Sequence, residues 1–252
     1  MRLFLSKLSN FLTICQLPKG LRLKFTESSF GLADLQVCAS LSQAGLQPRS
    51  IYDVGANVGQ FALAATTVWP GVPVFSFEPV PSAFEKLTKL SSKHASIRPI
   101  RLALGRNPGT VEMNITNYTT SSSLLKLHQN HRNLYPHVAE DTTIQVDVST
   151  VAAQLVHLPV RPPALLKLDV QGFESEVLHG AGGSINQFQW ILLETSTSPM
   201  YENEVLFQEI CVQLLEKGFS FTCPVQIHLT ESGAFSQFDA LFTNVAPDSR
   251  HT

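Results

Sequence analysis

The chain has 252 residues, of which 44% are hydrophobic and 15% are charged, so it can bury one substantial core with at most a small insertion. Its net charge of −2, without a Lys/Arg-rich run, excludes strong non-specific attraction to a polyanion, and we expect no nucleic-acid partner. The four cysteines form no Cys-x-x-Cys pair, which gives no support to a zinc ribbon or a disulfide framework and predicts a reducing, cytoplasmic location.

The first segment, residues 1–17, carries apolar residues at positions 4, 8, 11, 12 and 15, which is a helical spacing. It predicts an amphipathic helix that ends near Pro18 and Gly20. Polar residues interrupt it, so no run approaches the ~20 apolar residues that a membrane-spanning helix requires, and only a peripheral membrane contact is left open. A second helix is predicted over Ala33–Leu41, which makes residues 1–48 an N-terminal helical extension.

A strand, a glycine turn, a helix and a second strand follow. Ile51–Val54 is the first strand and leads into the glycine turn, Gly55–Gly59, and Val74–Phe77 is the second strand, which ends at Glu78. A backbone without β-carbons can approach a bound nucleoside, and a tight turn often needs positive φ. A carboxylate about 20 residues beyond such a turn can accept bonds from both ribose hydroxyls. The pattern predicts a nucleoside cofactor; the alternative is a turn with no ligand.

The details of the turn favour one cofactor. A dinucleotide site requires Gly-x-Gly-x-x-Gly, with the pyrophosphate at the helix N-terminus. Here Asn57 stands at the second glycine, and Gly59 comes one residue early. Asp53 would repel a pyrophosphate and could accept a bond from an ammonium group. These charges favour S-adenosylmethionine over NAD, and an NAD-dependent oxidoreductase is kept as the alternative.

Helices and short apolar runs then alternate along the chain. Pro81 is placed to open a helix, since proline is common in a first helical turn. The predicted strands are Ile97–Leu104, Leu165–Asp169, Trp190–Glu194, Gly218–Phe221 and Asp239–Thr243. This alternation predicts an α/β fold with a mostly parallel sheet and helices on both faces, in which the ligand sits beyond the carboxyl ends of the strands.

Residues 109–155 break this rhythm and predict an insertion. Val111–Ile115 and Thr143–Val148 alternate like strands that pair or lengthen the sheet, and the polar tract Thr116–Ser123 is predicted to lie over the cofactor cleft. A plain surface excursion is the alternative. Three histidines of the insertion match no standard metal-site spacing, and we expect no metal; they are His128, His131 and His137.

The apolar lead-in Ala164–Leu166 predicts a buried strand that places Asp169 at its carboxyl-terminal tip, in the same cleft. It could orient an acceptor hydroxyl or take its proton as a general base. Alternatively, it could cap the next helix. Glu174 is expected in the first turn of that helix, where a carboxylate complements the helix dipole.

Taken together, these motifs resemble the FkbM-type S-adenosylmethionine-dependent methyltransferases. The resemblance runs in order over roughly residues 50 to 245, through Asp53–Phe61, Ser76–Pro79, Leu102–Gly105, Ser121–Leu125, Leu166–Glu174 and Glu176–Ala181. It implies a class I, Rossmann-like domain with a seven-stranded sheet over residues 49–246, followed by a tail, residues 247–252. One departure is Gln171, where the family more often has Glu.

The resemblance also implies a function. Known members mostly methylate hydroxyl groups, so the expected acceptor is a hydroxyl of a small molecule, sugar, glycan or natural product, and a non-catalytic cofactor-binding module is the other alternative. Glu194 is the second candidate after Asp169 for contact with the acceptor, although it could equally cap a turn. The expected cofactor-binding residues are Asp53, Gly55, Ala56, Asn57, Gly59, Glu78, Pro79, Ala103 and Leu104.

Overall fold

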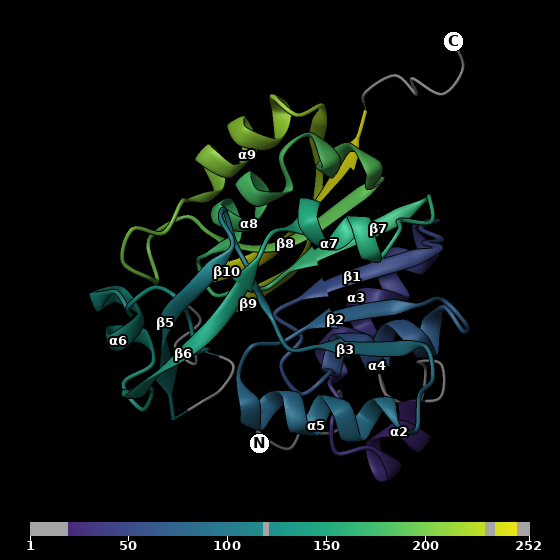
Figure 1. The fold of residues 1–252 in the computed structure, drawn as a ribbon, viewed down its shortest axis with the longest axis horizontal. Helices are drawn as coiled ribbons and strands as arrows, with labels where there is room; N and C mark the ends of the chain where they lie inside the picture. Colours follow the sequence, from purple (N-terminus) through teal and green to yellow (C-terminus); the bar gives the residue numbers. More distant parts are fainter. Residues whose placement is uncertain (1–19, 118–120, 230–234, 246–252) are drawn as a thin grey trace, which may run out of the picture.

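Short apolar runs form the central strands of the protein, which the computed structural model describes over residues 20–117, 121–229 and 235–245. Seven of them make one sheet in the order β3-β2-β1-β7-β8-β10-β9 (Figure 1). They are β1 (Ser50–Val54), β2 (Val74–Phe77), β3 (Ile97–Ile100), β7 (Ala164–Leu168), β8 (Trp190–Ser196), β9 (Phe219–Leu229) and β10 (Phe235–Asn244). β10 is antiparallel to β8 and β9, and the other neighbours are parallel. The predicted mostly parallel seven-stranded sheet is confirmed.

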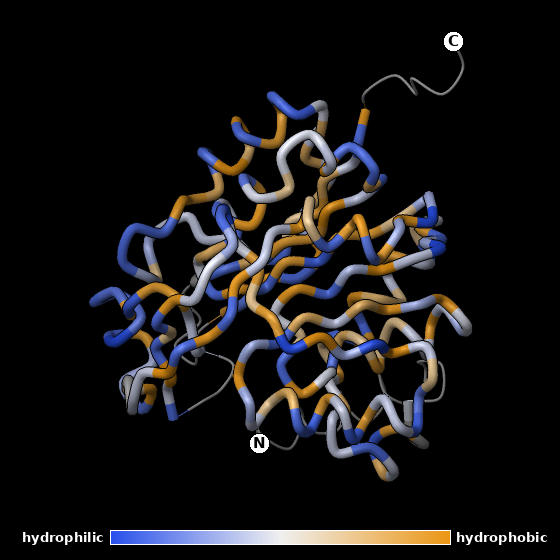
Figure 2. Tube along the Cα trace, in the orientation of Figure 1, coloured by the Kyte–Doolittle hydropathy of each residue, from blue (hydrophilic) through white to orange (hydrophobic). Residues whose placement is uncertain are grey.

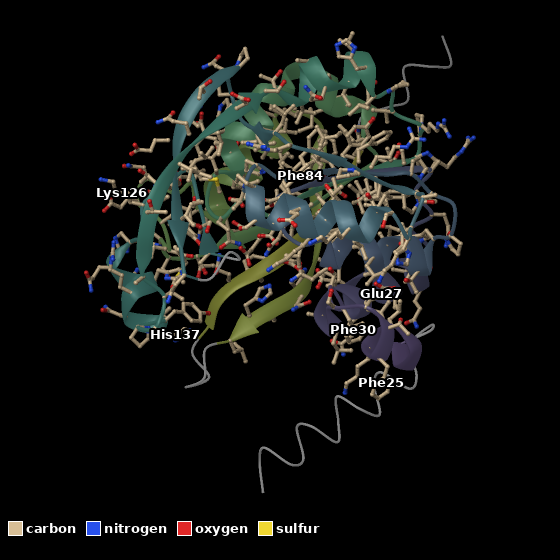
Figure 3. The ribbon with its side chains drawn as sticks, turned by 60° about the horizontal axis from the view of Figure 1, so that its bottom comes forward. Phe25, Glu27, Phe30, Phe84, Lys126 and His137 are labelled. Carbon is tan, nitrogen blue, oxygen red and sulfur yellow. The ribbon has the colours of Figure 1, made fainter. Side chains whose placement is uncertain are left out.

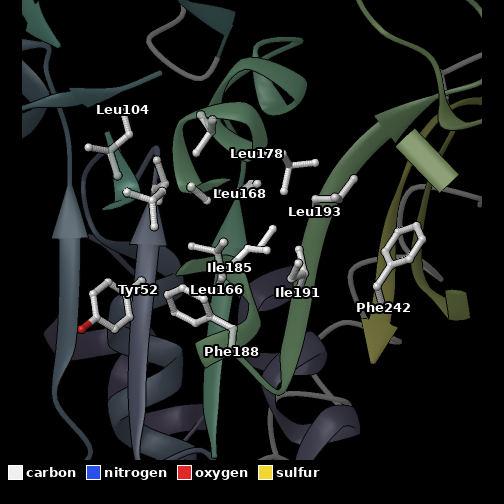
Figure 4. Close-up of a cluster of buried hydrophobic side chains, with 14 of the residues drawn as sticks. Tyr52, Leu104, Leu166, Leu168, Leu178, Ile185, Phe188, Ile191, Leu193 and Phe242 are labelled. Carbon is white, nitrogen blue, oxygen red and sulfur yellow. The ribbon is translucent and has the colours of Figure 1, made fainter. Parts of the chain in front are cut away.

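Helices cover both faces of this sheet, as the sequence predicts. One face packs against α3 (Leu32–Gln43), α4 (Gln60–Val68) and α5 (Pro81–Ser91), and the other against α7 (Val151–His157), α8 (Glu174–Ala181) and α9 (Phe207–Leu215). Successive residues of a strand point to opposite faces, so Ile51 enters the first core and Tyr52 the second. Apolar residues are concentrated along the central strands (Figure 2). In the second core the rings of Tyr52 and Phe188 meet edge to face, 5.1 Å apart (Figure 4).

The two strands of the insertion form a second sheet together with a short strand that precedes the insertion. The order of this sheet is β4-β6-β5, from β4 (Ala103–Leu104), β5 (Gly109–Thr116) and β6 (Glu140–Ser149), and α6 (Gln129–Leu134) lies between β5 and β6. The two predicted strands of the insertion therefore pair with each other but do not lengthen the main sheet. The single strand predicted over Ile97–Leu104 was wrong: the N–H of Leu102 bonds back to the carbonyl of Ile100 at 3.0 Å, and this tight reversal sends β4 into the second sheet.

Other differences concern the ends of elements. β9 and β10 extend well beyond the runs Gly218–Phe221 and Asp239–Thr243, because each continues the pairing of the other. The helix α2 (Gly20–Thr26) begins at the glycine where a helix end was predicted. The amphipathic segment 1–17 and the tail 247–252 lie outside the described residues. Within the described ranges, no helix is both long and apolar enough to cross a membrane.

One ion pair crosses the centre of the main sheet. Asp53 on β1 stands opposite Lys167 on β7, and the Lys167 ammonium lies 3.3 Å from a carboxylate oxygen of Asp53. Asp53 is fully buried, and Ser76 donates a hydrogen bond to its other oxygen at 3.4 Å. Burial raises the pKa of Asp53, and the neighbouring Lys167 opposes that rise. Removing the ammonium would leave a buried carboxylate without its cation.

We therefore predict that Lys167→Met lowers the free energy of unfolding by about 3–5 kcal/mol, the usual cost of breaking a buried pair from one side. Adding Asp53→Asn to this variant should restore part of the loss, because the uncompensated charge is then gone. Urea unfolding at pH 7 measures the free energy of unfolding of the single and the double variant.

The matched control is Lys126→Met. Lys126 is exposed at the surface of the insertion and points away from the molecule (Figure 3), so its loss should change the unfolding free energy by less than about 0.5 kcal/mol. Equal stability of Lys167→Met and the wild type would show that the pair contributes nothing.

Candidate active site

A cavity of about 450 Å³ opens at the carboxyl ends of the parallel strands. Residues at the ends of β1, β2 and β7 line it, together with residues of α3, of α4, of the insertion and of β8, β9 and β10. This is the crevice in which open α/β sheets bind ligands. Most of the expected site residues line it: Gly55, Ala56, Asn57, Glu78, Pro79, Ala103, Leu104, Asp169 and Glu194. Asp53 and Gly59 do not.

The glycines are required by packing against the protein itself. Gly55 and Gly59 have positive φ, +79° and +92°, as the tight turn predicts. A β-carbon on Gly55 would lie 1.9 Å from the carbonyl oxygen of Asp169, and one on Gly59 would lie 2.7 Å from Leu90 of α5. Gly59 thus fits the turn against α5 and is not in contact with the cavity, which leaves its predicted cofactor contact without support.

Asp53 also has a different place from the one expected. Its carboxylate is held by Lys167 and Ser76 inside the sheet and does not line the cavity. A bond from an ammonium group to Asp53 therefore has no support in this geometry. Asn57 offers an alternative acceptor in the turn: it lines the cavity, and its side-chain oxygen is buried without a hydrogen-bond partner among the described residues. An orphaned acceptor at a cavity wall is suited to a ligand donor.

Glu78 stands where the sequence places it, at the tip of β2. One carboxylate oxygen accepts from the N–H of Asn57 and the other from the N–H of Val80, both at 2.8 Å. These bonds fix the carboxylate at the cavity wall. Burial raises the pKa of Glu78 to about 7, against the two backbone bonds that lower it. The ionised fraction of Glu78 thus changes around neutral pH.

Gln171 joins the two candidate catalytic acids. Its amide nitrogen donates to Asp169 at 2.6 Å and to Glu194 at 2.9 Å. Its amide oxygen accepts from the hydroxyl of Tyr201 at 2.5 Å, which fixes the orientation of the amide. A glutamate here would face two carboxylates without a donor, so Gln171, the departure from the family pattern, suits this arrangement.

Neither acid is a cap. Helix α8 begins at Glu174 with Phe173 as its N-cap, and the oxygens of Asp169 accept from Gln171 and Lys167 instead. Glu194 lies inside β8, so the turn-cap alternative was also wrong. Burial, and then the nearby Asp169 and Asp239, raise the pKa of Glu194 well above its ordinary value.

Glu174 does stand in the first turn of α8, and it accepts from the N–H of Val170 at 2.9 Å. Its carboxylate therefore holds the turn that follows Asp169. Burial raises the pKa of Glu174 to about 8.

The insertion contributes directly to the cavity. Ser121 and Ser122 of the polar tract line it, as predicted, so the plain surface excursion was wrong for these residues. His131 and His137 line it too, and His137 is labelled in Figure 3. Burial lowers the pKa of His131 to about 4, so this ring is neutral at physiological pH.

Sequence reasoning missed the residues that reach the cavity from β9 and β10, chiefly His228 and Asp239. Tyr201 was also missed as a site residue; it is fully buried and reaches the site through Gln171. The alternation of Gln226 and His228 along β9 places both on one face and was the one local signal available.

Comparison with known proteins gives the family. Residues 53–221 match the methyltransferase FkbM domain. Methyltransferase 1 of Beauveria bassiana is 26% identical over 183 residues, covering 68% of this chain and 72% of the relative. Hexuronic acid methyltransferase AglP of Haloferax volcanii is 26% identical over 147 residues, covering 57% and 54%. The 31-O-demethyl-FK506 methyltransferase FkbM of Streptomyces tacrolimicus is 24% identical over 193 residues, covering 68% and 72%. The chain is a member of the FkbM methyltransferase family.

Proposed function

We propose that this protein transfers the methyl group of S-adenosylmethionine to a hydroxyl group of a sugar or another hydroxyl-bearing natural product. The observation that carries the proposal is that two sets of polar groups line one cavity, and each set is described below as one half of it. Glu78 and Asn57, with the walls formed by Ala103 and Leu104, make a half suited to a nucleoside. Asp169 and Glu194 make a half suited to a hydroxyl acceptor.

The chemistry of the first half fits S-adenosylmethionine. The Glu78 oxygens keep lone pairs that can accept from ribose hydroxyls, and the unpartnered oxygen of Asn57 can accept from an ammonium group. When bound, the cofactor supplies a methyl group already activated on a sulfonium. Asp34, Glu78 and Asp169 are acids at the cavity wall, and Lys167 is paired with two carboxylates. A pyrophosphate would meet an excess of negative charge, which favours this cofactor over NAD.

In the second half, Asp169 is held from both sides. Lys167 lies 3.3 Å from one oxygen, and Gln171 donates to the other. The Asp169 side chain is still 37% exposed, so it can meet an acceptor. We assign it to orient the acceptor hydroxyl and to take its proton as methyl transfer proceeds. Glu194 holds the same amide and extends the polar surface that an acceptor would contact.

The relatives support a hydroxyl acceptor. One is described as acting on a hexuronic acid and another on 31-O-demethyl-FK506. The side chains that the insertion places at the cavity, among them Ser122, Tyr135 and His137, offer hydrogen bonds and ring faces of the kind that bind polyhydroxylated molecules.

The cofactor assignment predicts that the purified protein binds S-adenosylmethionine and S-adenosylhomocysteine more tightly than NAD in isothermal titration. The Glu78 carboxylate accepts bonds from ribose hydroxyls best when it is ionised, and its pKa lies near 7. The affinity for S-adenosylmethionine should therefore rise by up to about tenfold from pH 6 to pH 8. In Glu78→Gln the affinity at pH 8 should fall at least about tenfold, and the pH dependence should be lost.

The matched control is Glu85→Gln, since Glu85 is an exposed acid on α5 that pairs with Lys89 outside the cavity. This control variant should titrate like the wild type. Tighter binding of NAD than of S-adenosylmethionine would overturn the methyltransferase cofactor site, and an unchanged affinity in Glu78→Gln would show that Glu78 does not face the ribose.

The catalytic assignment predicts that Asp169→Asn keeps cofactor affinity and lowers turnover by a factor of about 10² or more, as expected when a general base is removed. Turnover is measured as transfer of a labelled methyl group into a panel of sugars, glycans, glycolipids, polyketides and phenols. Asp147→Asn, on the exposed side of β6, is the control and should be fully active.

Near-wild-type turnover of Asp169→Asn on a responding acceptor would move the proton-accepting role to Glu194. Cofactor binding without transfer to any member of the panel would favour the non-catalytic module.

A further inference from the structure

Three side chains from neighbouring antiparallel strands come together at the wall of the cavity. Glu194 on β8 is directly opposite Asp239 on β10, and His228 on β9 is opposite Gln237, two residues before Asp239. Opposite and diagonal side chains on one face of a sheet lie within reach of each other. Glu194, His228 and Asp239 all line the cavity.

Their polar atoms are close enough to share one ion. His228 Nε2 lies 3.4 Å from Asp239 Oδ1 and 3.8 Å from Glu194 Oε1, and one ligand atom from each residue lies within 4.8 Å of the others. Atoms bound to one ion at about 2.0–2.3 Å are separated by about 3–4.5 Å. Small side-chain movements would therefore bring all three to coordination distance.

The second oxygen of Glu194 is already fixed by amide donors. Gln171 donates to it at 2.9 Å and Gln237 at 3.1 Å, while the first oxygen faces His228. Metal-binding carboxylates are typically oriented by such outer hydrogen bonds.

The charges around the three residues favour a cation. Asp169, Glu194 and Asp239 bring three carboxylates to this part of the cavity. The ammonium of Lys167 is shared between Asp169 and Asp53, so it neutralises little of the negative charge of Glu194 and Asp239. His228, if protonated, would compensate one of them. The three side chains are 13–32% exposed, which leaves them open to the cavity.

We propose that Glu194, His228 and Asp239 bind one divalent cation whose free coordination positions face the acceptor half of the cavity. Three protein ligands with open positions are typical of catalytic metal sites, and a nitrogen with two carboxylates suits Mn²⁺, Fe²⁺ or Zn²⁺. From the sequence we expect no metal at the histidines of the insertion. The site proposed here consists of other residues, which strand pairing brings together.

The role of the ion rests on the proposed methyl transfer. An acceptor hydroxyl bound to the cation loses its proton more readily. The proton passes to the carboxylate of Asp169, the oxygen forms a bond to the methyl carbon, and the carbon–sulfur bond breaks with its electron pair leaving on the sulfur. The binding of the ion itself does not depend on that reaction.

The test is a titration of the metal-free protein with Mn²⁺ alone, followed by electron paramagnetic resonance, in which the signal of the free ion is lost on binding. We expect one ion per chain. His228→Ala and Asp239→Asn should each weaken binding at least about tenfold, the lower end of what even outer residues of metal sites cost. Gln226→Ala, two residues before His228 on the same strand face, is the matched control and should bind like the wild type.

The proposed site is overturned if the wild type binds no Mn²⁺ at about 1 mM, or if His228→Ala and Asp239→Asn both bind Mn²⁺ as tightly as the wild type does. The three residues are then a histidine–carboxylate pair and its neighbour. Circular dichroism checks that each variant is folded, and His228→Gln replaces the alanine variant if that one is not. A parallel titration with S-adenosylhomocysteine separates the two proposals: cofactor binding without Mn²⁺ binding overturns the cation alone, and Mn²⁺ binding without cofactor binding overturns the proposed function alone.

Discussion

The rest of the site depends on the ion pairs that the ammonium of Lys167 makes with two carboxylates. The ammonium lies between Asp53, inside the sheet, and Asp169, at the cavity, at 3.3 Å from each. Burial alone would lower the pKa of Lys167, but the carboxylates of Asp169, Asp53 and Asp34 raise it above its ordinary value. One cation thus links β1 to β7 beneath the glycine turn and also holds an oxygen of Asp169, so the main sheet and the proposed acceptor half of the cavity share a single constraint.

The sequence was sufficient to predict what local patterns determine. The run from Ile51 to Glu78 specifies strand, positive-φ turn, helix and acid within one short segment, and the structure reproduces each step. What local pattern could not separate was contact with a ligand from contact with the protein. In the sequence alone, Gly59 and Asp53 both fit a cofactor site. In the structure Gly59 packs against α5 and Asp53 pairs with Lys167, and these neighbours come from other parts of the chain.

The residues that were missed have one cause in common. His228 and Asp239 reach the cavity through the register of an antiparallel pair, and Tyr201 reaches it through the side chain of Gln171. Register depends on pairing between strands far apart in sequence, and a shift by one residue would turn these side chains to the other face. No window along the sequence contains that information, whereas Asp169 and Glu194 follow apolar runs that can be identified locally.

The separate sheet of the insertion has a consequence for how this fold can diversify. Among the described residues, the ladders of β5 and β6 join them to each other and to β4, and none of these strands pairs with the seven-stranded sheet. Residues can therefore be gained or lost between β5 and β6 without a change of register at Asp53, Lys167 or Asp239. The segment between β5 and β6 also carries residues that line the cavity, among them Ser122, Tyr135 and His137. Relatives can thus acquire new acceptors by altering the segment between β5 and β6, while β6 keeps its pairing with β4 beside the proposed cofactor half.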